Sequence, residues 1–170
     1  MMKHPGAAIV LISVTISGAA CAGSIGPERD IPIKAPTKSS KAYIAMQKAY
    51  TASIAPILEA KCFDCHSQHP HFPWYYRFPL AGSLIDMDIR KARRLLDLTD
   101  GLPFTGRGSL DDHLTALRDV VVDGSMPPFR YTIIHRNSRL TRAEQDLVIA
   151  WAEGKLPSAP VATAPTGKKK

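Results

Sequence analysis

Two cysteines and a histidine stand close together in the stretch Cys62-Phe63-Asp64-Cys65-His66. Residues three positions apart lie on one face of a helical turn, so both thiols can reach the same group. The C-x-x-C-H pattern is associated with covalent attachment of haem through the cysteines, and the adjacent imidazole can turn to the iron. The spacing therefore predicts a c-type haem bound at Cys62, Cys65 and His66.

Three other sites would use the same cysteines. A structural disulfide needs only the two thiols and leaves His66 without a role. A redox dithiol is expected beside a βαβ pattern, which this sequence lacks. A zinc ion would add His69 and His71 to the cysteines, although structural zinc usually takes its second pair of ligands from a well-separated segment.

Met126, in the stretch DGSMPPFRY, is the best-placed candidate for a second axial ligand. Gly124 lets the loop turn, and the Pro-Pro pair after the methionine stiffens the chain. A stiff loop can hold a thioether against iron with little loss of entropy, and His/Met ligation raises the reduction potential. The alternatives are a methionine that only fills the core, and a bis-histidine site that uses His113 or His135.

Helical signals outnumber strand signals around these residues. Apolar side chains recur at helical spacing in four segments, at residues 42–61, 84–98, 110–122 and 141–154. In the last segment Thr141 and Glu144 form a capping box, and Gly154 is suited to end the helix. We predict an all-α domain, in which helices and Pro- and Gly-rich loops form a small cytochrome c-like fold around one haem.

The two ends of the chain have the composition of segments outside a folded core. Residues 1–22 combine a basic start, an apolar run and small residues around Cys21, which is typical of an export signal. Residues 23–40 and 157–170 show no apolar periodicity, and we interpret them as a flexible linker and a disordered basic tail. The haem-binding domain is therefore expected at residues 41–156.

An export signal predicts a periplasmic or otherwise extracytoplasmic protein, in a compartment where thiols oxidise. Two cleavage sites compete, because ACA at residues 20–22 fits a signal peptidase site, whereas GAAC at residues 18–21 resembles a lipoprotein box. Cys21 is removed in the first case and becomes a lipid-modified membrane tether in the second. In both cases Cys62 and Cys65 remain as the pair to explain.

The positive charge of the chain does not indicate a nucleic-acid partner. The net charge of the 170 residues is +7, but residues 168–170 are all lysine. Residues 41–157 carry 15 Lys and Arg against 13 Asp and Glu, so the predicted domain is nearly neutral. It also lacks the basic, aromatic-interleaved motif of RNA-binding domains.

Three blocks of the sequence resemble the haem-binding domain family of bacterial c-type cytochromes. CFDCHSQHPHFPWY at residues 62–75 is similar to the family's C-Y-D-C-H-S-x-x-x-x-(W/Y)-P-W-Y. ARRLLDLT at 92–99 resembles GRKHLNFS, and MPPFRYTIIHRNSRLTRAEQDLVIAW at 126–151 resembles MPPxxYxxLHxxAxLSxAExxxLxxW. The resemblance implies thioether bonds at Cys62 and Cys65. It further implies His66 as proximal ligand and Met126 as distal ligand.

Aromatic residues follow the C-x-x-C-H motif closely and are expected to wall the porphyrin. Trp74, Tyr75 or Arg77 is a candidate hydrogen-bond donor to a haem propionate, with pure packing as the alternative. Arg93 is a further propionate candidate, and a solvated helix face is the competing interpretation.

These observations predict an exported monohaem c-type cytochrome, an electron carrier rather than a catalyst, that passes single electrons from a donor protein to an acceptor protein. Two other functions stay open. One is a haem-bearing accessory subunit of a larger oxidoreductase. The other is a haem protein with an open iron position and peroxidase-like or ligand-sensing activity. A zinc or disulfide domain is the alternative without haem.

Overall fold

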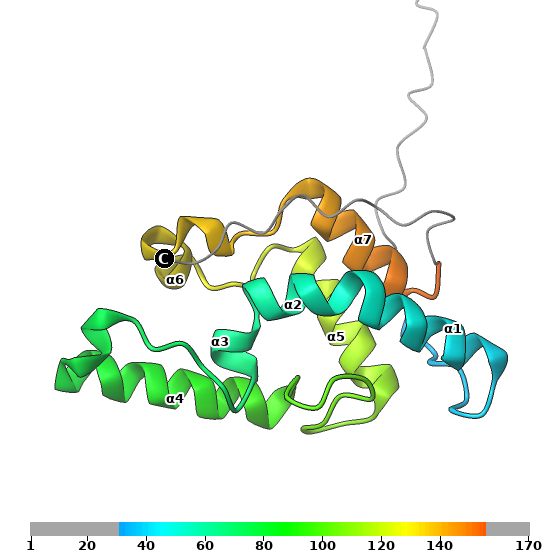
Figure 1. Cartoon of the computed structure of the whole chain (residues 1–170), viewed down its shortest axis with the longest axis horizontal. Coiled ribbons are helices and arrows are strands. Elements are labelled where there is room, and N and C mark those ends of the chain that lie inside the picture. The colour runs from blue at the N-terminus through cyan, green and yellow to red at the C-terminus, as the bar shows by residue number, and fades with distance from the viewer. Residues whose placement is uncertain (1–30, 156–170) are drawn as a thin grey trace, which may run out of the picture.

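The computed structural model describes residues 31–155 and builds this part of the chain from helices and loops (Figure 1). The elements are α1 (Lys41–Ala49), the π-helical turn η1 (Tyr50–Ile54), α2 (Ala55–Lys61), α3 (Phe63–His66), the 3-10 turn η2 (Trp74–Arg77), α4 (Pro79–Leu95), α5 (Leu110–Val122), α6 (Phe129–Ile134), the 3-10 turn η3 (Arg136–Ser138) and α7 (Arg142–Ala152). Within 31–155 the β-pairing is limited to an isolated bridge between Asp97 and Thr105. The prediction of an all-α domain is confirmed.

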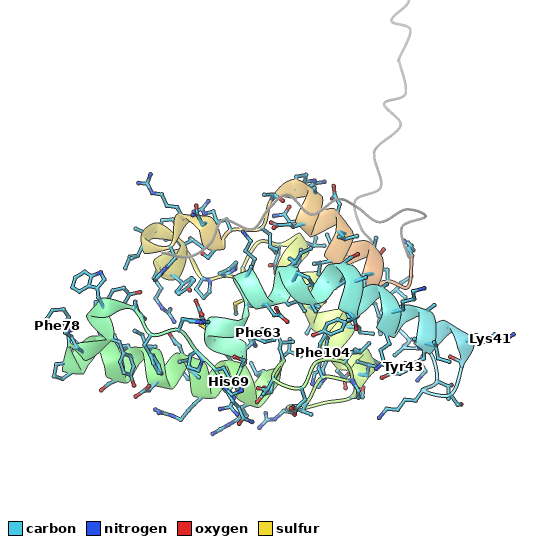
Figure 2. The ribbon with its side chains drawn as sticks, viewed as in Figure 1. Lys41, Tyr43, Phe63, His69, Phe78 and Phe104 are labelled. Atoms are coloured by element: carbon cyan, nitrogen blue, oxygen red, sulfur yellow. The ribbon has the colours of Figure 1, made fainter. Side chains whose placement is uncertain are left out.

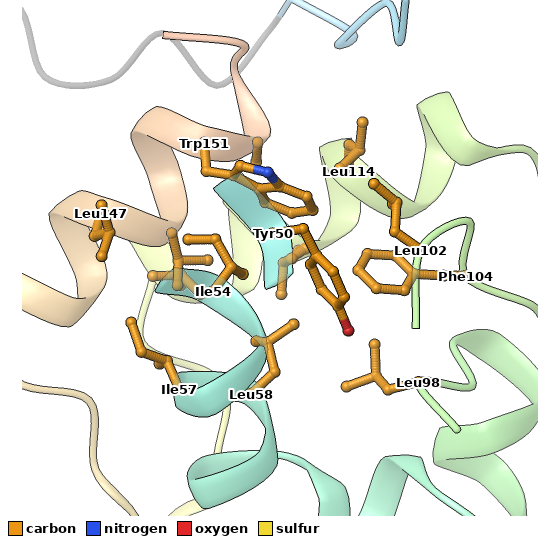
Figure 3. Close-up of a cluster of buried hydrophobic side chains, with 14 of the residues drawn as sticks. Tyr50, Ile54, Ile57, Leu58, Leu98, Leu102, Phe104, Leu114, Leu147 and Trp151 are labelled. Atoms are coloured by element: carbon orange, nitrogen blue, oxygen red, sulfur yellow. The ribbon is translucent and has the colours of Figure 1, made fainter. Parts of the chain in front are cut away.

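The apolar core is a cluster of buried side chains from α1, η1, α2, α5 and α7, in which α5 packs against α7, and η1 packs against both α7 and α2. Tyr50, Phe104 and Trp151 form its aromatic centre, with ring centroids 5.6 to 6.1 Å apart (Figure 3). Trp151 is completely buried, and its indole N–H donates to the Met46 carbonyl at 3.1 Å. Because α2 is part of this core, the chain that continues from it into α3 starts from a fixed position.

The long helix α4 begins five residues earlier than the apolar pattern predicts. Pro79 occupies its first turn, where a missing N–H is tolerated. Gly82 allows η2 to lie directly on α4, because a Cβ at this position would be 2.7 Å from the Tyr76 carbonyl oxygen. The helix ends at Leu95, and Leu96 and Asp97 are already extended or bridged. The aromatic turn η2 is thereby held against the start of α4.

Residues 31–35 are bound to α5, although their composition predicts a linker. The Ile33 N–H donates to Thr115 Oγ1 at 2.9 Å, and the Ala35 N–H donates to Asp111 Oδ1 at 2.9 Å. The folded unit therefore includes residues 31–35, which lie in the predicted linker at 23–40. The predicted export signal at 1–22, the linker residues 23–30 and the tail at 157–170 lie outside the described residues.

None of the helices between residues 31 and 155 combines the length and the apolar character that a membrane span requires.

Candidate functional site

The C-x-x-C-H stretch continues from α2 into the short helix α3. Cys62 ends α2, and the N–H groups of Cys65 and His66 both donate to its carbonyl, at 3.1 and 3.0 Å. The stretch is therefore a single helical turn, which places the two thiols on the same side. Both cysteines are half-buried and neither forms a disulfide.

The His66 ring has one nitrogen engaged and one available. Its Nδ1 lies 2.8 Å from the Leu96 carbonyl oxygen. Since a carbonyl can only accept, Nδ1 carries the proton and Nε2 keeps its lone pair. Burial lowers the pKa of His66 below 6.5, although the bond to Leu96 and the charge of Asp97 act in the opposite direction. The imidazole is therefore neutral at pH 7, the form that binds a metal ion.

The Leu96 carbonyl is held by the backbone of the turn after α4. The Leu98 N–H donates to the His66 carbonyl at 2.7 Å, which ties this turn directly to α3. Asp97 and Thr105 exchange two backbone hydrogen bonds, at 2.7 and 3.2 Å. These bonds at the two residues after Leu96 fix the direction of its carbonyl, and thus the orientation of the His66 ring.

The Asp97 carboxylate adds a second set of contacts to this turn. It accepts hydrogen bonds from Arg93 Nε at 2.9 Å, from the Thr99 N–H at 3.0 Å and from the Thr99 hydroxyl. Burial alone would raise the pKa of Asp97, but these bonds outweigh burial and hold the pKa below 3.8. The sequence predicts Arg93 as a candidate hydrogen-bond donor to a haem propionate. In the structure its Nε–H donates to the Asp97 carboxylate.

Asp97→Asn is expected to lower the free energy of unfolding at pH 7 by about 2 kcal/mol, because hydrogen bonds to a charged acceptor are lost. A carboxylate whose pKa is lower in the folded protein contributes stability above pH 4, and this contribution disappears as the pH falls through the folded pKa. The difference between the variant and the wild type should therefore shrink below pH 4. Urea unfolding of both proteins at pH 7 and pH 3 measures this difference in the free energy of unfolding.

The control for this prediction is Asp100→Asn, since Asp100 is exposed in the same turn. It should leave stability unchanged at both pH values. An Asp97→Asn variant as stable as the wild type at pH 7 would contradict the assignment.

Four aromatic and polar side chains connect α6 to α3 and η2. The Tyr131 hydroxyl donates to Asp64 Oδ2 at 2.6 Å, and the Tyr131 ring stacks on His135 with centroids 4.3 Å apart. The Tyr75 hydroxyl lies 2.8 Å from His135 Nε2. Burial, together with the Asp64 carboxylate, raises the pKa of Tyr131, so this phenol stays a donor. The sequence predicts Tyr75 as a site residue, but not Tyr131 or Asp64.

The remaining predicted propionate candidates lie on the surface of η2. Trp74 is 71% exposed. Arg77 is also exposed, and its Nε donates to the Trp74 carbonyl at 3.1 Å. Their roles toward a haem stay predictions.

Met126 lies in the loop between α5 and α6 and is 42% exposed. It lines a shallow cavity of about 380 Å³, whose wall also includes Pro127, Phe129 and Thr132. This wall does not include the two cysteines or His66. The link between the Met126 loop and α3 runs instead through the bond from Tyr131 to Asp64, five residues further along the chain.

Large apolar side chains are exposed on the elements that flank α3. In Figure 1, α4 and α6 extend past α3 toward the same end of the molecule. Leu80, Leu84 and Met87 follow one another at helical spacing on one face of α4, and Phe129, Ile133 and Ile134 are exposed on α6. The Phe78 end of α4 is visible in Figure 2. So much exposed apolar surface on a small domain is typical of a binding site.

Comparison with known proteins decides the class of this chain. The model of the haem-binding domain family matches residues 29–154. The chain belongs to the haem-binding domain family. The cytochrome c peroxidase Ccp of Escherichia coli (strain K12) is 27% identical to it over 95 residues, which cover 55% of this chain and 20% of that protein. The domain thus spans about a fifth of the relative's length. No solved structure matches the chain.

The residues of this haem-binding domain fit the group that its family binds. His66 presents a neutral imidazole with Nε2 available, and the thiols of Cys62 and Cys65, which form no disulfide, lie on the same helical turn. Burial raises the pKa of Cys62 to about 12, the opposite of what a reactive redox dithiol requires. The apolar side chains of α4 and α6 are suited to cover the faces of a porphyrin.

The geometry does not support the alternative of a zinc site that combines the two cysteines with His69 and His71. His69 and His71 are exposed, and the Nδ1 of His71 lies 3.3 Å from Asp64 Oδ1. Across residues 31–155, no group of three or more His, Cys, Asp or Glu side chains is arranged to hold a metal ion.

Proposed function

We propose that this haem-binding domain is an exported c-type cytochrome that transfers single electrons through one covalently attached haem. Cys62 and Cys65 would hold the haem through thioether bonds, and His66 would ligate the iron. The observation that carries the proposal is the 2.8 Å contact between His66 Nδ1 and the Leu96 carbonyl, which leaves Nε2 for the iron on the same turn as two cysteines that form no disulfide. A free Nε2 and two thiols on one turn are what covalent attachment and proximal ligation need.

Met126 is the distal ligand in this proposal. The bond from Tyr131 to Asp64 brings the segment that follows Met126 beside α3, and the methionine side chain is exposed and free of the core. The two histidines that would replace it have other partners. His135 Nε2 contacts the Tyr75 hydroxyl, whereas His113 is buried on α5 with its Nε2 3.2 Å from the Arg107 carbonyl.

A bound haem supplies one-electron redox chemistry. The chain's own residues determine how this chemistry is used. The Leu96 carbonyl keeps the proton on His66 Nδ1, so that Nε2 would keep its lone pair for the iron. The exposed apolar side chains of α4 and α6 would exclude water from a bound haem, and Met126 would bind the iron in competition with peroxide or a small ligand. These features favour electron transfer over catalysis.

The sequence supports the remaining parts of the proposal. The export signal at 1–22 indicates a periplasmic or other extracytoplasmic location, with Cys21 as a candidate lipid anchor. The partners would be a donor and an acceptor redox protein. A second function, peroxidase-like activity or service as a haem-bearing module of a larger oxidoreductase, is favoured by the similarity to a protein named cytochrome c peroxidase, of which this chain spans a fifth.

A spectroscopic redox titration of the exported holoprotein distinguishes these functions. We expect a single one-electron step, with a slope of about 59 mV per tenfold change in the ratio of oxidised to reduced protein. Low-spin spectra are expected in both oxidation states, together with no turnover of hydrogen peroxide. A high-spin resting spectrum with rapid peroxide turnover would contradict the electron-carrier proposal and favour the second function.

A further inference from the structure

We propose that Tyr131 is a positioning residue that holds the Met126 loop against the haem-attachment turn. This inference rests on the proposed function, because it concerns the same distal ligand. Its basis is the bond from the Tyr131 hydroxyl to Asp64 Oδ2 at 2.6 Å, which joins residues 67 positions apart. One partner lies inside the C-x-x-C-H motif, and the other lies in the helix that follows Met126.

The acceptor in this bond is well placed to act as an anchor. Asp64 stands between the two cysteines, and its side chain is 13% exposed. The His71 N–H also donates to it, at 3.3 Å. Hydrogen bonds to an ionised carboxylate are shorter and stronger than those between neutral groups. The bond from Tyr131 therefore attaches α6 to a side chain that cannot move without the haem-attachment turn.

A second contact attaches the other end of α6. His135 caps this helix, stacks on the Tyr131 ring and contacts the Tyr75 hydroxyl at 2.8 Å. The helix is thus tied to α3 near its middle and to η2 at its end. Both ties depend on the position of the Tyr131 ring.

The segment of chain that connects Met126 to Tyr131 is short and conformationally restricted. The N–H groups of Tyr131 and Thr132 both donate to the Pro128 carbonyl, at 2.9 and 3.1 Å. One helical turn and the Pro-Pro pair therefore connect the anchored ring to the methionine. A neutral thioether is a weak ligand, so its occupancy depends on a loop that is already in place. Loss of the anchor should let Met126 leave the iron more often.

Tyr131→Phe tests this role, because it removes the hydroxyl and keeps the ring that stacks on His135. In the ferric holoprotein we expect a weaker thioether-to-iron absorption band and imidazole binding to the iron that is about tenfold to a hundredfold tighter. Hydrogen exchange at the backbone amides of residues 129–135 should be faster. Asp64→Asn, which removes the charge and keeps an acceptor, should act in the same direction with a smaller effect.

Tyr76→Phe is the matched control, since it removes a hydroxyl bond to a carboxylate that joins η2 to α4, at 2.9 Å from Asp86. It should leave imidazole affinity unchanged. A wild type with a clear thioether band and a Tyr131→Phe variant within twofold of it in imidazole affinity would overturn the positioning role alone. A wild type without that band would overturn Met126 ligation, and this inference with it.

Discussion

Replacing both Cys62 and Cys65 by alanine is expected to abolish covalent haem attachment completely in the exported protein. The thioether bonds need both sulfur atoms, and the His66 ligand alone gives only reversible binding. The apolar side chains of α4 and α6 would then stay exposed to water, so we also expect a lower yield of folded protein. Mass spectrometry of the denatured protein measures the loss directly.

The single variants and a distant cysteine complete this experiment. Cys62→Ala should retain haem through one bond and shift the visible bands of the reduced protein to longer wavelength, because one vinyl group stays conjugated. Cys21→Ala is the control, since Cys21 is assigned to the export region, and it should leave haem attachment unchanged. Haem that stays covalently bound to the double variant would place the attachment at other residues.

Met126→Ala is expected to keep the haem attached but to convert the iron from low-spin to high-spin. Loss of the thioether should lower the reduction potential by at least about 0.1 V, a fraction of the roughly 0.8 V range that axial ligands span. It should also open the iron to cyanide and peroxide. Visible spectra and a redox titration measure all three effects.

Met87→Ala is the matched control, because Met87 is another exposed methionine, 37% exposed on α4. Because Met87 is not a proposed ligand, its loss should leave the spin state unchanged and shift the potential far less than Met126→Ala does. If Met126→Ala instead had the wild-type spectrum, the distal ligand would be His113 or His135. The proposal that Tyr131 positions Met126 for the iron would then be wrong.

The helices that sequence periodicity predicts are those with long apolar faces. The segments at 110–122 and 141–154 correspond to α5 and α7, and both carry the side-chain caps that mark a helix start. The short helix α6 and the turn η2 were missed, since elements of four to six residues depend on tertiary contacts rather than on their own periodicity. The binding of residues 31–35 to α5 was missed for the same reason.

The residues of the candidate site also fall into two groups, those that local sequence spacing predicts and those that only long-range contacts bring to the site. Cys62, Cys65 and His66 could be found from sequence because their chemistry requires fixed local spacing. The Leu96 carbonyl could not, because a backbone acceptor 30 residues away has no side-chain signature. The bond from Tyr131 to Asp64 is also long-range, although the tyrosine falls within one of the blocks that resemble the family.

The measurement that tests the central claim most directly is the intact mass of the full-length protein, combined with its visible spectrum. The protein is expressed with its predicted export signal and denatured before its mass is measured. We predict the mass of the mature chain plus one haem, together with a low-spin c-type spectrum. The same mass locates the mature N-terminus and shows whether Cys21 carries lipid. A mature chain without added haem mass, in protein that was exported and supplied with haem, would contradict covalent attachment at Cys62 and Cys65.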